Sequence, residues 1–418
     1  MNQAMIFFYI YLMLIVFSAI SLIYYLINSY SSVFYHDDGN VEGHSPSEVT
    51  IIVPVYNEDV STFERVMRRL QFQGSRIIVV GDSSLEPYRS ITESSGGTFL
   101  YKEQREGKRK AIAHAMRLVN TPFVMFVDSD AVLPPNAVNN LLKKFRNEVG
   151  GVSGLIKIDN DGSAVSYSSE FSERVREVIL KATSMHGNVL YLDGACSVYR
   201  TDLVSDFILS DEFKEYKVMG RKSLLGDDRQ LSSFVIKSGY KIARNFNVVV
   251  TTKSQKDFKS YFRQQVRWAR TGWVSLFRDA RNGTLRKAGP FYSFEIFYVY
   301  VIPLLLFIIG FFRFGFYLMP LFHHIGHMDV YFLESYAVFV FTTTFMGFHV
   351  ASKFLLARVF TAVANIAGST VFGIAVSATM VKEKLKTFAY GSISLVIMFA
   401  AAIYGLFTFW KQGKWMTR

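Results

Sequence analysis

Five long apolar runs frame this chain of 418 residues and constrain its fold more than any other feature. They lie at residues 4–27, 292–314, 333–352, 357–381 and 388–410, and the first carries no charged side chain. An α-helix rises about 1.5 Å per residue, so each run is long enough to cross the hydrocarbon core of a bilayer. One such run could be a buried core helix, but five predict a multi-pass membrane protein.

The region between the first two runs, residues 28–290, is predicted to form a domain on the cytoplasmic side of the membrane. The chain has a net charge of +12, and most of its Lys and Arg residues fall in this region. Lys and Arg accumulate on the cytoplasmic side of membrane proteins. With five crossings, three lysines would lie in an outside loop, so one C-terminal segment could instead be interfacial or re-entrant: Lys382, Lys384 and Lys386.

Other classes of protein fit this composition poorly. The first run lacks the basic start and small-residue cleavage site of a signal peptide. A basic chain could bind nucleic acid, but no helix-turn-helix, zinc pattern or aromatic RNA signature is present, so no nucleic acid partner is predicted. The lone Cys196 excludes an intrachain disulfide and fits a reducing compartment.

The middle domain alternates predicted strands with predicted helices. β-Branched runs predict buried strands at 49–56, 76–80 and 123–127, separated by helical stretches at 60–73 and 108–119. This alternation predicts an α/β domain with a mainly parallel sheet. Ligands bind beyond the carboxyl ends of such strands. The polar side chains placed there are Tyr56, Asn57, Glu58, Asp82, Asp128 and Asp130.

Asp128 and Asp130 put two carboxylates on one short turn after the third predicted strand. Carboxylate oxygens are suitable ligands for Mg²⁺ or Mn²⁺, and such a cation would neutralise a diphosphate. A solvated loop turn is the simpler interpretation of an Asp-x-Asp pattern. The position at a strand end, ahead of Pro134-Pro135, favours a metal site.

Gly226-Asp227-Asp228-Arg229 pairs two adjacent carboxylates with an Arg. Mutual repulsion should raise the pKa of one carboxyl group, and the Arg should lower the other. One of them could then accept a proton from a hydroxyl nucleophile. Alternatively, Asp227 or Asp228 caps the helix predicted over 229–238, and both interpretations can hold together.

Gln264, Arg267 and Trp268 lie on a predicted helix just ahead of the second apolar run, with Gln264 and Trp268 on one face. An Arg suits diphosphate oxygens, and a Trp ring suits the apolar face of a sugar. The alternative is an interfacial helix with a snorkelling Arg. A further basic segment, Glu106–Ala111, lies at the start of a predicted helix and contains Lys108. Basic side chains and free backbone N–H groups at a helix start predict an anion site.

Taken in order, these motifs resemble those of membrane-embedded, processive family 2 glycosyltransferases. This group includes hyaluronan synthases and the type 3 capsule polysaccharide synthase and, more distantly, cellulose and chitin synthases. The similarity covers nearly the whole chain. The matching segments are Val53–Glu58, Gly107–Arg109, Val127–Asp130, Asp193-Gly194, Val198–Arg200, Gly226–Arg229, Gln264–Trp268 and Trp415–Arg418.

The resemblance implies a GT-A nucleotide-sugar-binding domain, an α/β fold with a mixed, mainly parallel sheet, joined to an α-helical transmembrane region. The expected segments are an N-terminal transmembrane helix (1–28), a linker (29–48), the cytoplasmic catalytic domain (49–252), interfacial helices (253–290), C-terminal transmembrane helices (291–411) and a terminal Trp-x-Thr-Arg segment (412–418).

The resemblance also implies roles for individual residues. Asp228, beside Asp227, would be the general base, and Asp130 with Asp128 would bind Mg²⁺ or Mn²⁺. The acceptor would contact Trp268, Asp193 and Gly194. The donor would contact Tyr56, Glu58, Asp82, Lys108, Asp128, Gln264, Arg267, Trp415 and Arg418, with Tyr56 stacking on uracil.

The function expected from this resemblance is inverting transfer of a sugar from a UDP-sugar to a growing β-linked extracellular polysaccharide, with translocation of the polymer across the cell membrane. The acceptor could instead be a membrane lipid, giving a glycolipid in single transfers. A transporter or receptor with a soluble domain fits less well, because the acidic chemistry clusters outside the apolar runs. The motifs leave open which sugar is used.

Overall fold

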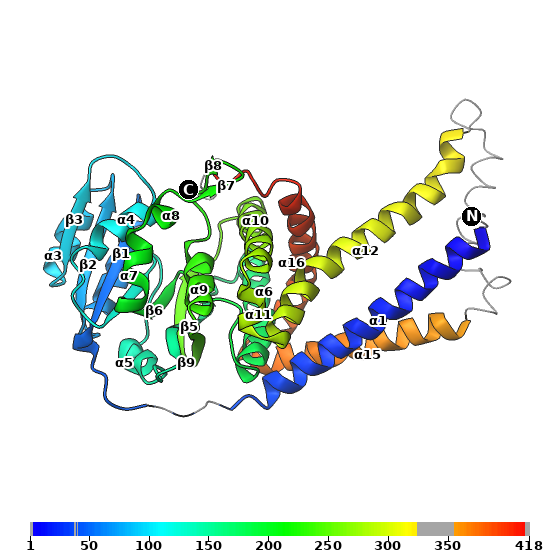
Figure 1. The fold of residues 1–418 in the computed structure, drawn as a ribbon, viewed down its shortest axis with the longest axis horizontal. Coiled ribbons are helices and arrows are strands. Elements are labelled where there is room, and N and C mark those ends of the chain that lie inside the picture. Colours follow the sequence, from blue (N-terminus) through cyan, green and yellow to red (C-terminus); the bar gives the residue numbers. More distant parts are fainter. Residues whose placement is uncertain (1–2, 37–38, 40, 324–354, 414–418) are drawn as a thin grey trace. The chain divides into compact units, whose positions relative to one another are not determined.

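The computed structural model describes residues 3–36, 39, 41–323 and 355–413, which fall into two compact units (Figure 1). The predicted apolar run at 333–352 lies outside the described residues. The helical unit comprises Met1–Tyr30 and Phe297–Ala375, and the sheet unit comprises Ser31–Ile296 and Val376–Arg418. The end of the predicted transmembrane region therefore belongs with the sheet unit.

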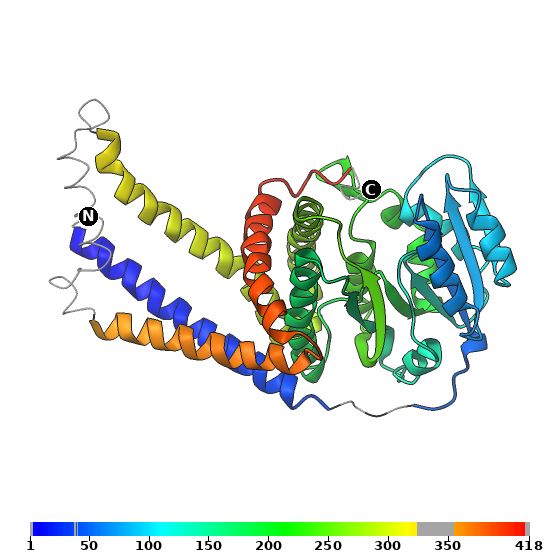
Figure 2. The ribbon, with the colours of Figure 1, turned by 180° about the vertical axis from the view of Figure 1, so that it is seen from behind.

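A seven-stranded sheet with the order β3-β2-β1-β4-β6-β5-β9 forms the centre of the sheet unit (Figures 1 and 2). β1 is parallel to β2 and β4, β2 is parallel to β3, and β5 is parallel to β9. Only β6 is antiparallel to both of its neighbours within this sheet. The predicted mixed, mainly parallel sheet is confirmed. The strands are β1 Val49–Val55, β2 Arg76–Asp82, β3 Thr98–Lys102, β4 Phe123–Val127, β5 Val149–Asp159, β6 Cys196–Arg200, β7 Lys217–Val218, β8 Arg221–Lys222 and β9 Lys241–Lys253.

Helices follow most strands, and local signals explain where several begin. The Asp59 carboxylate, for example, accepts the Thr62 N–H at 2.9 Å and caps α2. The helices of this unit are η1 Pro46–Glu48, α2 Val60–Leu70, α3 Tyr88–Ser94, α4 Lys108–Met116, α5 Ala137–Leu142, α6 Ala164–Met185, α7 Thr201–Leu209, α8 Asp211–Lys214, α9 Asp227–Lys237, α10 Phe258–Arg281, α11 Thr284–Ala288 and α16 Lys384–Leu406.

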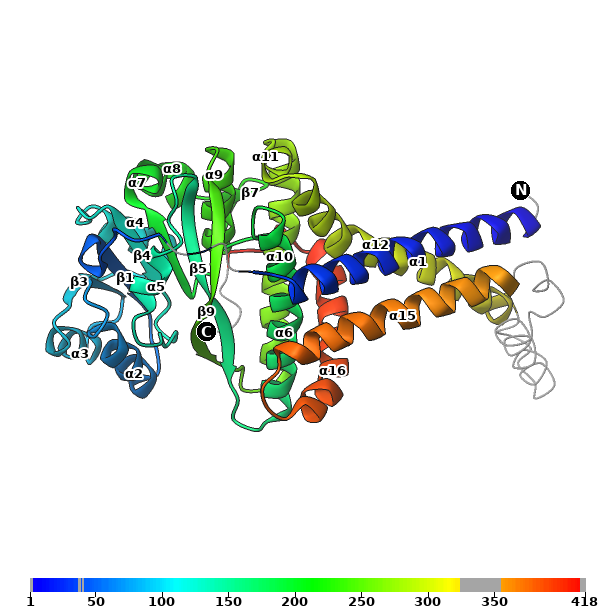
Figure 3. The same cartoon turned by 90° about the horizontal axis from the view of Figure 1, so that it is seen from below.

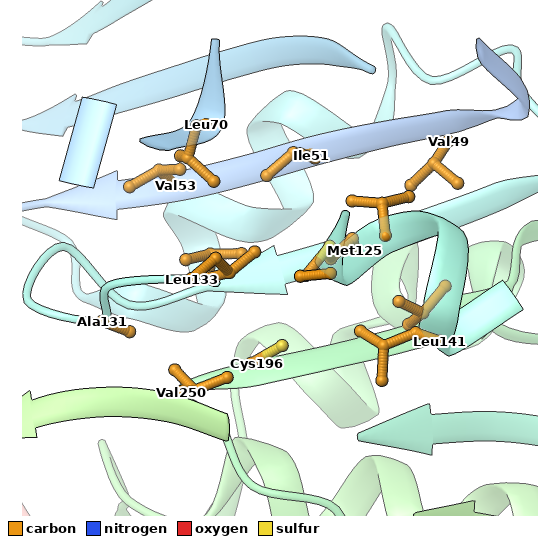
Figure 4. Packing of buried hydrophobic residues seen from close by; sticks show 14 of the residues in the cluster. Val49, Ile51, Val53, Leu70, Met125, Ala131, Leu133, Leu141, Cys196 and Val250 are labelled. Carbon is orange, nitrogen blue, oxygen red and sulfur yellow. The ribbon is translucent and has the colours of Figure 1, made fainter. Parts of the chain in front are cut away.

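The hydrophobic core lies between the sheet and its covering helices (Figure 4). Val53 of β1, Met125 of β4 and Leu70 of α2 are fully buried in it. Burying a side chain of the size of Leu70 stabilises the fold by about 2 kcal/mol. Cys196 also lies in this cluster, and burial raises the pKa of its thiol to about 12. This cysteine is therefore a packing residue rather than a reactive one.

The edge strand β3 and the short α3 before it were not expected from the sequence. β3 is only partly buried, so it lacks the continuous apolar run that marks β1, β2 and β4. A partly solvated edge strand leaves a weak pattern in the sequence. The third strand predicted, at 123–127, is thus β4 of the sheet.

The helical unit consists mainly of α1 (Gln3–Val33), α12 (Pro290–His323) and α15 (Leu355–Thr379) (Figure 3). The Asn365 amide donates to the Ser18 hydroxyl at 3.3 Å, and the Tyr25 and Phe372 ring centroids lie 5.2 Å apart. α1 and α15 therefore run parallel, because both contacts advance in the same direction along the two helices. The Tyr24 ring stacks on Tyr298 of α12.

Four helices in the described part of the chain are long and apolar enough to cross a membrane. Their candidate spans are Leu12–Val33, Pro290–Ile309, Val359–Thr379 and Lys384–Leu406. All four overlap apolar runs that were predicted from the sequence, which supports a membrane protein. The fourth, in α16, packs along α6 and α10 of the sheet unit. We call α6, α10 and α16 together the helical wall (Figure 1).

Candidate active site

A cavity of about 750 Å³ opens at the carboxyl ends of β1, β2 and β4. The beginnings of α4 and α9 and one face each of α6 and α10 complete its lining. The cavity brings together motifs that are far apart in the sequence. The predicted residues that line it are Tyr56, Asp82, Lys108, Asp128, Asp130, Asp193, Gly194, Asp227, Asp228, Gln264, Arg267 and Trp268.

Asp128 and Asp130 form an acidic corner of this cavity, directly after β4. Burial raises the pKa of Asp128, and the charge of Asp130 adds to this effect against the opposing charge of Lys108. The repulsion between the two carboxylates would be relieved by a bound cation. Among the residues that the structure describes, no group of three His, Cys, Asp or Glu side chains could hold a metal ion. Two carboxylates completed by substrate phosphates are nevertheless a usual set of ligands for Mg²⁺.

Lys108 connects the two acidic motifs. Its ammonium lies 2.7 Å from Asp128 Oδ1 and 3.2 Å from Asp227 Oδ2. Burial alone would lower the pKa of Lys108, but the two carboxylates outweigh it and raise the pKa above its ordinary value. Lys108 is therefore a fixed positive charge at the centre of the cavity.

Asp227 and Asp228 occupy the first turn of α9, and their predicted role as the N-cap is wrong. Gly226 is the N-cap residue, with φ of 72° and no capping side chain. A Cβ at Gly226 would lie 2.5 Å from Thr271 Cγ2, so the approach of α10 also requires a glycine here. Asp228 Oδ1 nevertheless accepts the Arg229 N–H of this first turn at 2.7 Å.

The pKa values of this pair are displaced in opposite directions, as predicted, but the residues that lower one of them differ from the prediction. Burial raises the pKa of Asp228, and repulsion from Asp227 raises it further. Burial also acts on Asp227, yet Lys108 and Arg109 outweigh it and lower the pKa of this group. Arg229, the predicted cause of the lowering, instead acts on Asp228. Asp228 is therefore the more basic of the two carboxylates.

The loop that faces Asp228 allows close approach because it contains Gly194. A Cβ there would lie 3.1 Å from the Lys108 ammonium and 3.6 Å from Asp228. The neighbouring Asp193 carboxylate accepts a hydrogen bond from Arg244 of β9 at 2.5 Å. Asp193 therefore lines the cavity, and its ion pair with Arg244 fixes the position of its carboxylate there.

Tyr56 and Asp82 also line the cavity. The Arg105 guanidinium lies 3.6 Å from the centroid of the Tyr56 ring. The Asp82 oxygens accept the backbone N–H groups of Glu106 and Gly107, at 2.9 and 2.8 Å. Asp82 therefore fixes the turn that leads into Lys108, a contact that the sequence did not predict.

Of the other predicted donor residues, Glu58 does not line the cavity. Glu58 accepts a hydrogen bond from the Ser129 hydroxyl at 2.9 Å, so it supports the Asp128–Asp130 turn from behind. Trp415 and Arg418 lie outside the described residues. Gly413, which precedes them, does line the cavity.

α6 contributes a polar stripe that sequence reasoning missed. Ser169, Ser172, Glu173 and Arg176 line the cavity from successive turns of this helix. Arg176 donates to the Glu173 carboxylate at 3.1 and 3.2 Å, and its guanidinium lies 4.5 Å from the centroid of the Trp268 ring. The sequence offered only one signal for this stripe, which is that its polar residues recur every three or four positions. The same spacing is common on helices whose polar face is solvated.

The fold and this cavity define a GT-A glycosyltransferase whose chain also carries helices of membrane-spanning length. Residues 40–271 match the profile of Glycosyltransferase like family 2, and the chain belongs to this family. The predicted family 2 glycosyltransferase is thereby confirmed, although the membership leaves the donor and the acceptor open.

Several curated proteins are similar to this chain. The N-acetylglucosaminyltransferase of Rhizobium meliloti is 28% identical over 61% of the chain, and that of Azorhizobium caulinodans is 30% identical over 55%. The hyaluronan synthase of Streptococcus pyogenes is 27% identical over 56% of the chain. These alignments span only 62%, 60% and 58% of the relatives' own lengths.

A solved structure shares the fold. A mannosyltransferase from Pyrobaculum calidifontis, in complex with GDP-Man and Mn²⁺, superposes with a TM-score of 0.57 at 17% identity. The match covers 85% of this chain and 98% of the mannosyltransferase.

Proposed function

We propose that the protein is an inverting glycosyltransferase that transfers a sugar from a UDP-sugar to a growing β-linked polysaccharide at a membrane. The observation that carries this proposal is the meeting of Asp228, the Asp128–Asp130 corner and Trp268 in one cavity. Relatives named N-acetylglucosaminyltransferase and hyaluronan synthase support a sugar donor and a polymeric product.

The acidic corner fits a divalent cation, because its two hard carboxylate oxygen donors repel each other in a buried setting. Asp130 and Asp128 would hold Mg²⁺ or Mn²⁺, which when bound would neutralise the donor diphosphate. Lys108 and Arg267 line the same cavity and would contribute fixed positive charge to the departing diphosphate.

Asp228 is the proposed general base. Its raised pKa makes the carboxylate a better proton acceptor than an ordinary aspartate. It takes the proton of the acceptor hydroxyl as that oxygen forms a bond to the anomeric carbon, and the bond from this carbon to the diphosphate breaks with its electron pair. A single in-line displacement inverts the configuration and requires no covalent enzyme intermediate.

Trp268 and the polar stripe of α6 form the proposed acceptor side of the cavity. An indole ring offers an apolar surface to a sugar, while Glu173 and Arg176 offer an acceptor and donors for its hydroxyl groups. Arg176 also holds its guanidinium over the indole, which fixes the ring before the sugar arrives.

The product distinguishes the polysaccharide from a glycolipid. The full chain, purified in lipid nanodiscs, is incubated with individual UDP-sugars and with pairs of them, and products are sized by gel and mass spectrometry. Long polymer supports the proposal. A lipid carrying a single sugar would contradict the polymer and support the non-processive alternative.

Replacing Arg176 by Gln should impair use of the acceptor far more than use of the donor. We expect KM for an added oligosaccharide acceptor to rise roughly tenfold, with the donor KM changed less than about twofold, because one charged hydrogen-bonding group is lost. Arg176→Lys is the matched control, since it keeps the charge but loses the planar fork. Equal changes in both KM values would contradict this assignment.

Activity should fall on acidification at a higher pH than an ordinary aspartate would give. The base works when ionised, and burial raises the pKa of Asp228 above 3.8, so activity is lost as pH falls through the raised value. The measurement is the initial rate at saturating substrates between about pH 4 and 9 at constant ionic strength. A rate that stays flat down to about pH 4 would contradict the raised pKa.

A further inference from the structure

The carboxylate of Asp193 is held at the wall of the cavity by an arginine that stands behind it. Arg244 of β9 donates to Asp193 Oδ2 at 2.5 Å. The same guanidinium donates to the backbone carbonyls of Gly154 and Tyr191, at 2.8 and 3.1 Å. The side chain of Arg244 is 1% exposed and does not line the cavity, whereas that of Asp193 is 12% exposed and does. A bound molecule therefore meets the carboxylate end of this ion pair.

This carboxylate lies beside the proposed general base. Asp193 precedes Gly194, and a Cβ at Gly194 would lie 3.6 Å from Asp228. Under the proposed function, Asp228 takes the proton of a hydroxyl on the last sugar of the acceptor. That sugar must then lie next to the turn that carries Asp193.

The arginines on this side of the cavity are already engaged. Glu173 of α6, in the helical wall, accepts hydrogen bonds from Arg176 at 3.1 and 3.2 Å. Burial raises the pKa of Glu173, and the charge of Asp193 raises it further against the charge of Arg176, so the two carboxylates lie close together. The charge of Arg229 opposes the rise in the pKa of Asp228. The positive charge that α6 brings is thus matched by a carboxylate of the same helix.

The ionised carboxylate of Asp193 accepts hydrogen bonds and donates none. A neutral sugar meets this requirement, because its hydroxyl groups and the N–H of any acetamido group are donors. A uronic acid brings a carboxylate of its own, which is ionised at neutral pH and is repelled by a fixed carboxylate in a site of low dielectric constant. The charge of Asp193 therefore favours a neutral sugar at the end of the acceptor.

We propose, resting on the proposed function, that Asp193 restricts the acceptor to a chain that ends in a neutral sugar, and thereby restricts the product to a polymer of neutral sugars. Each transfer joins the acceptor oxygen to the anomeric carbon of the donor, so the sugar just added supplies the next acceptor hydroxyl. A uronate that entered as donor would therefore end the chain. The donors that can build a long product are UDP-hexoses and UDP-N-acetylhexosamines.

Two primers test this restriction without any substitution. The full chain in nanodiscs is supplied with UDP-glucose or UDP-N-acetylglucosamine and with oligosaccharides of equal length that end in either a neutral sugar or a uronate. We expect kcat/KM to be at least about tenfold lower for the uronate-ended primer, because like charges then meet. Equal use of both primers would overturn the proposal. Failure to extend either primer would contradict the proposed function itself.

Replacing Asp193 by Asn should reduce the difference between the two primers to less than about threefold, since the substitution removes the charge and keeps the shape. Asp206→Asn is the matched control, because Asp206 is exposed on α7 and does not line the cavity. It should leave the tenfold difference unchanged. Asp193→Asn that extends the neutral primer normally and still rejects the uronate would contradict the role of Asp193.

A mixture of donors gives a second measurement in the unmodified chain, independent of whether Asp193→Asn folds. UDP-N-acetylglucosamine mixed with UDP-glucuronate should give polymer that contains no uronate or a single uronate at its growing end. Mass spectrometry of the digested product locates the uronate. Uronate at internal positions of the polymer would overturn the proposal.

Discussion

Asp228→Asn should lower kcat by about a thousandfold and leave the affinity for the UDP-sugar nearly unchanged, because it removes the proton acceptor while keeping the shape of the side chain. The measurements are the rate of UDP release at saturating donor and acceptor, and donor binding by calorimetry. Asp228 lies on the first turn of α9 with its pKa raised by burial and by Asp227, which suits a base and not a diphosphate ligand.

The matched control for this variant is Asp211→Asn. Asp211 is also near the start of a helix, but its side chain is 87% exposed, and it does not line the cavity. The same chemical change there should leave kcat unaltered. Normal turnover in Asp228→Asn, or an equal loss in both variants, would contradict the assignment of the base.

Asp130→Asn, or removal of divalent cations by a chelator, should reduce transfer by at least about a hundredfold, since the donor diphosphate would lose its neutralising charge. Addition of Mg²⁺ or Mn²⁺ should restore the chelated enzyme but not the variant. Tight donor binding should require the cation in the parent chain, which calorimetry with and without Mn²⁺ can measure.

Lys108 allows a finer test of the acidic corner. Its ammonium already lies 2.7 Å from Asp128, so part of the repulsion there is relieved without a metal. Full transfer and unchanged donor affinity in the presence of chelator would show that Lys108 suffices, and would contradict a metal at Asp128 and Asp130.

Much of this cavity could be predicted from the sequence because its chemistry lies at the ends of apolar strands. β1 and β4 are continuous apolar runs, and the polar residues that follow them must meet at one edge of a parallel sheet. Asp128 and Asp130 were found in this way, whereas Asp228 was found from the adjacent carboxylates of Gly226–Arg229 and from the order of the motifs.

The missing parts depend on contacts between residues that are distant in the chain. Arg176 belongs to a charged helix that resembles a solvated surface, and only the packing of α6 beside α10 brings it to Trp268. The partners of Asp227 and Asp193 are Lys108 and Arg244, which no local pattern connects to them.

The most direct test of the central claim compares UDP release with sugar incorporation in the same reaction, using the full chain in nanodiscs and a radiolabelled UDP-sugar. We expect one labelled sugar in polymer for each UDP released, and loss of both signals in Asp228→Asn. UDP release without any labelled polymer or glycolipid, or incorporation that persists undiminished in Asp228→Asn, would contradict the claim.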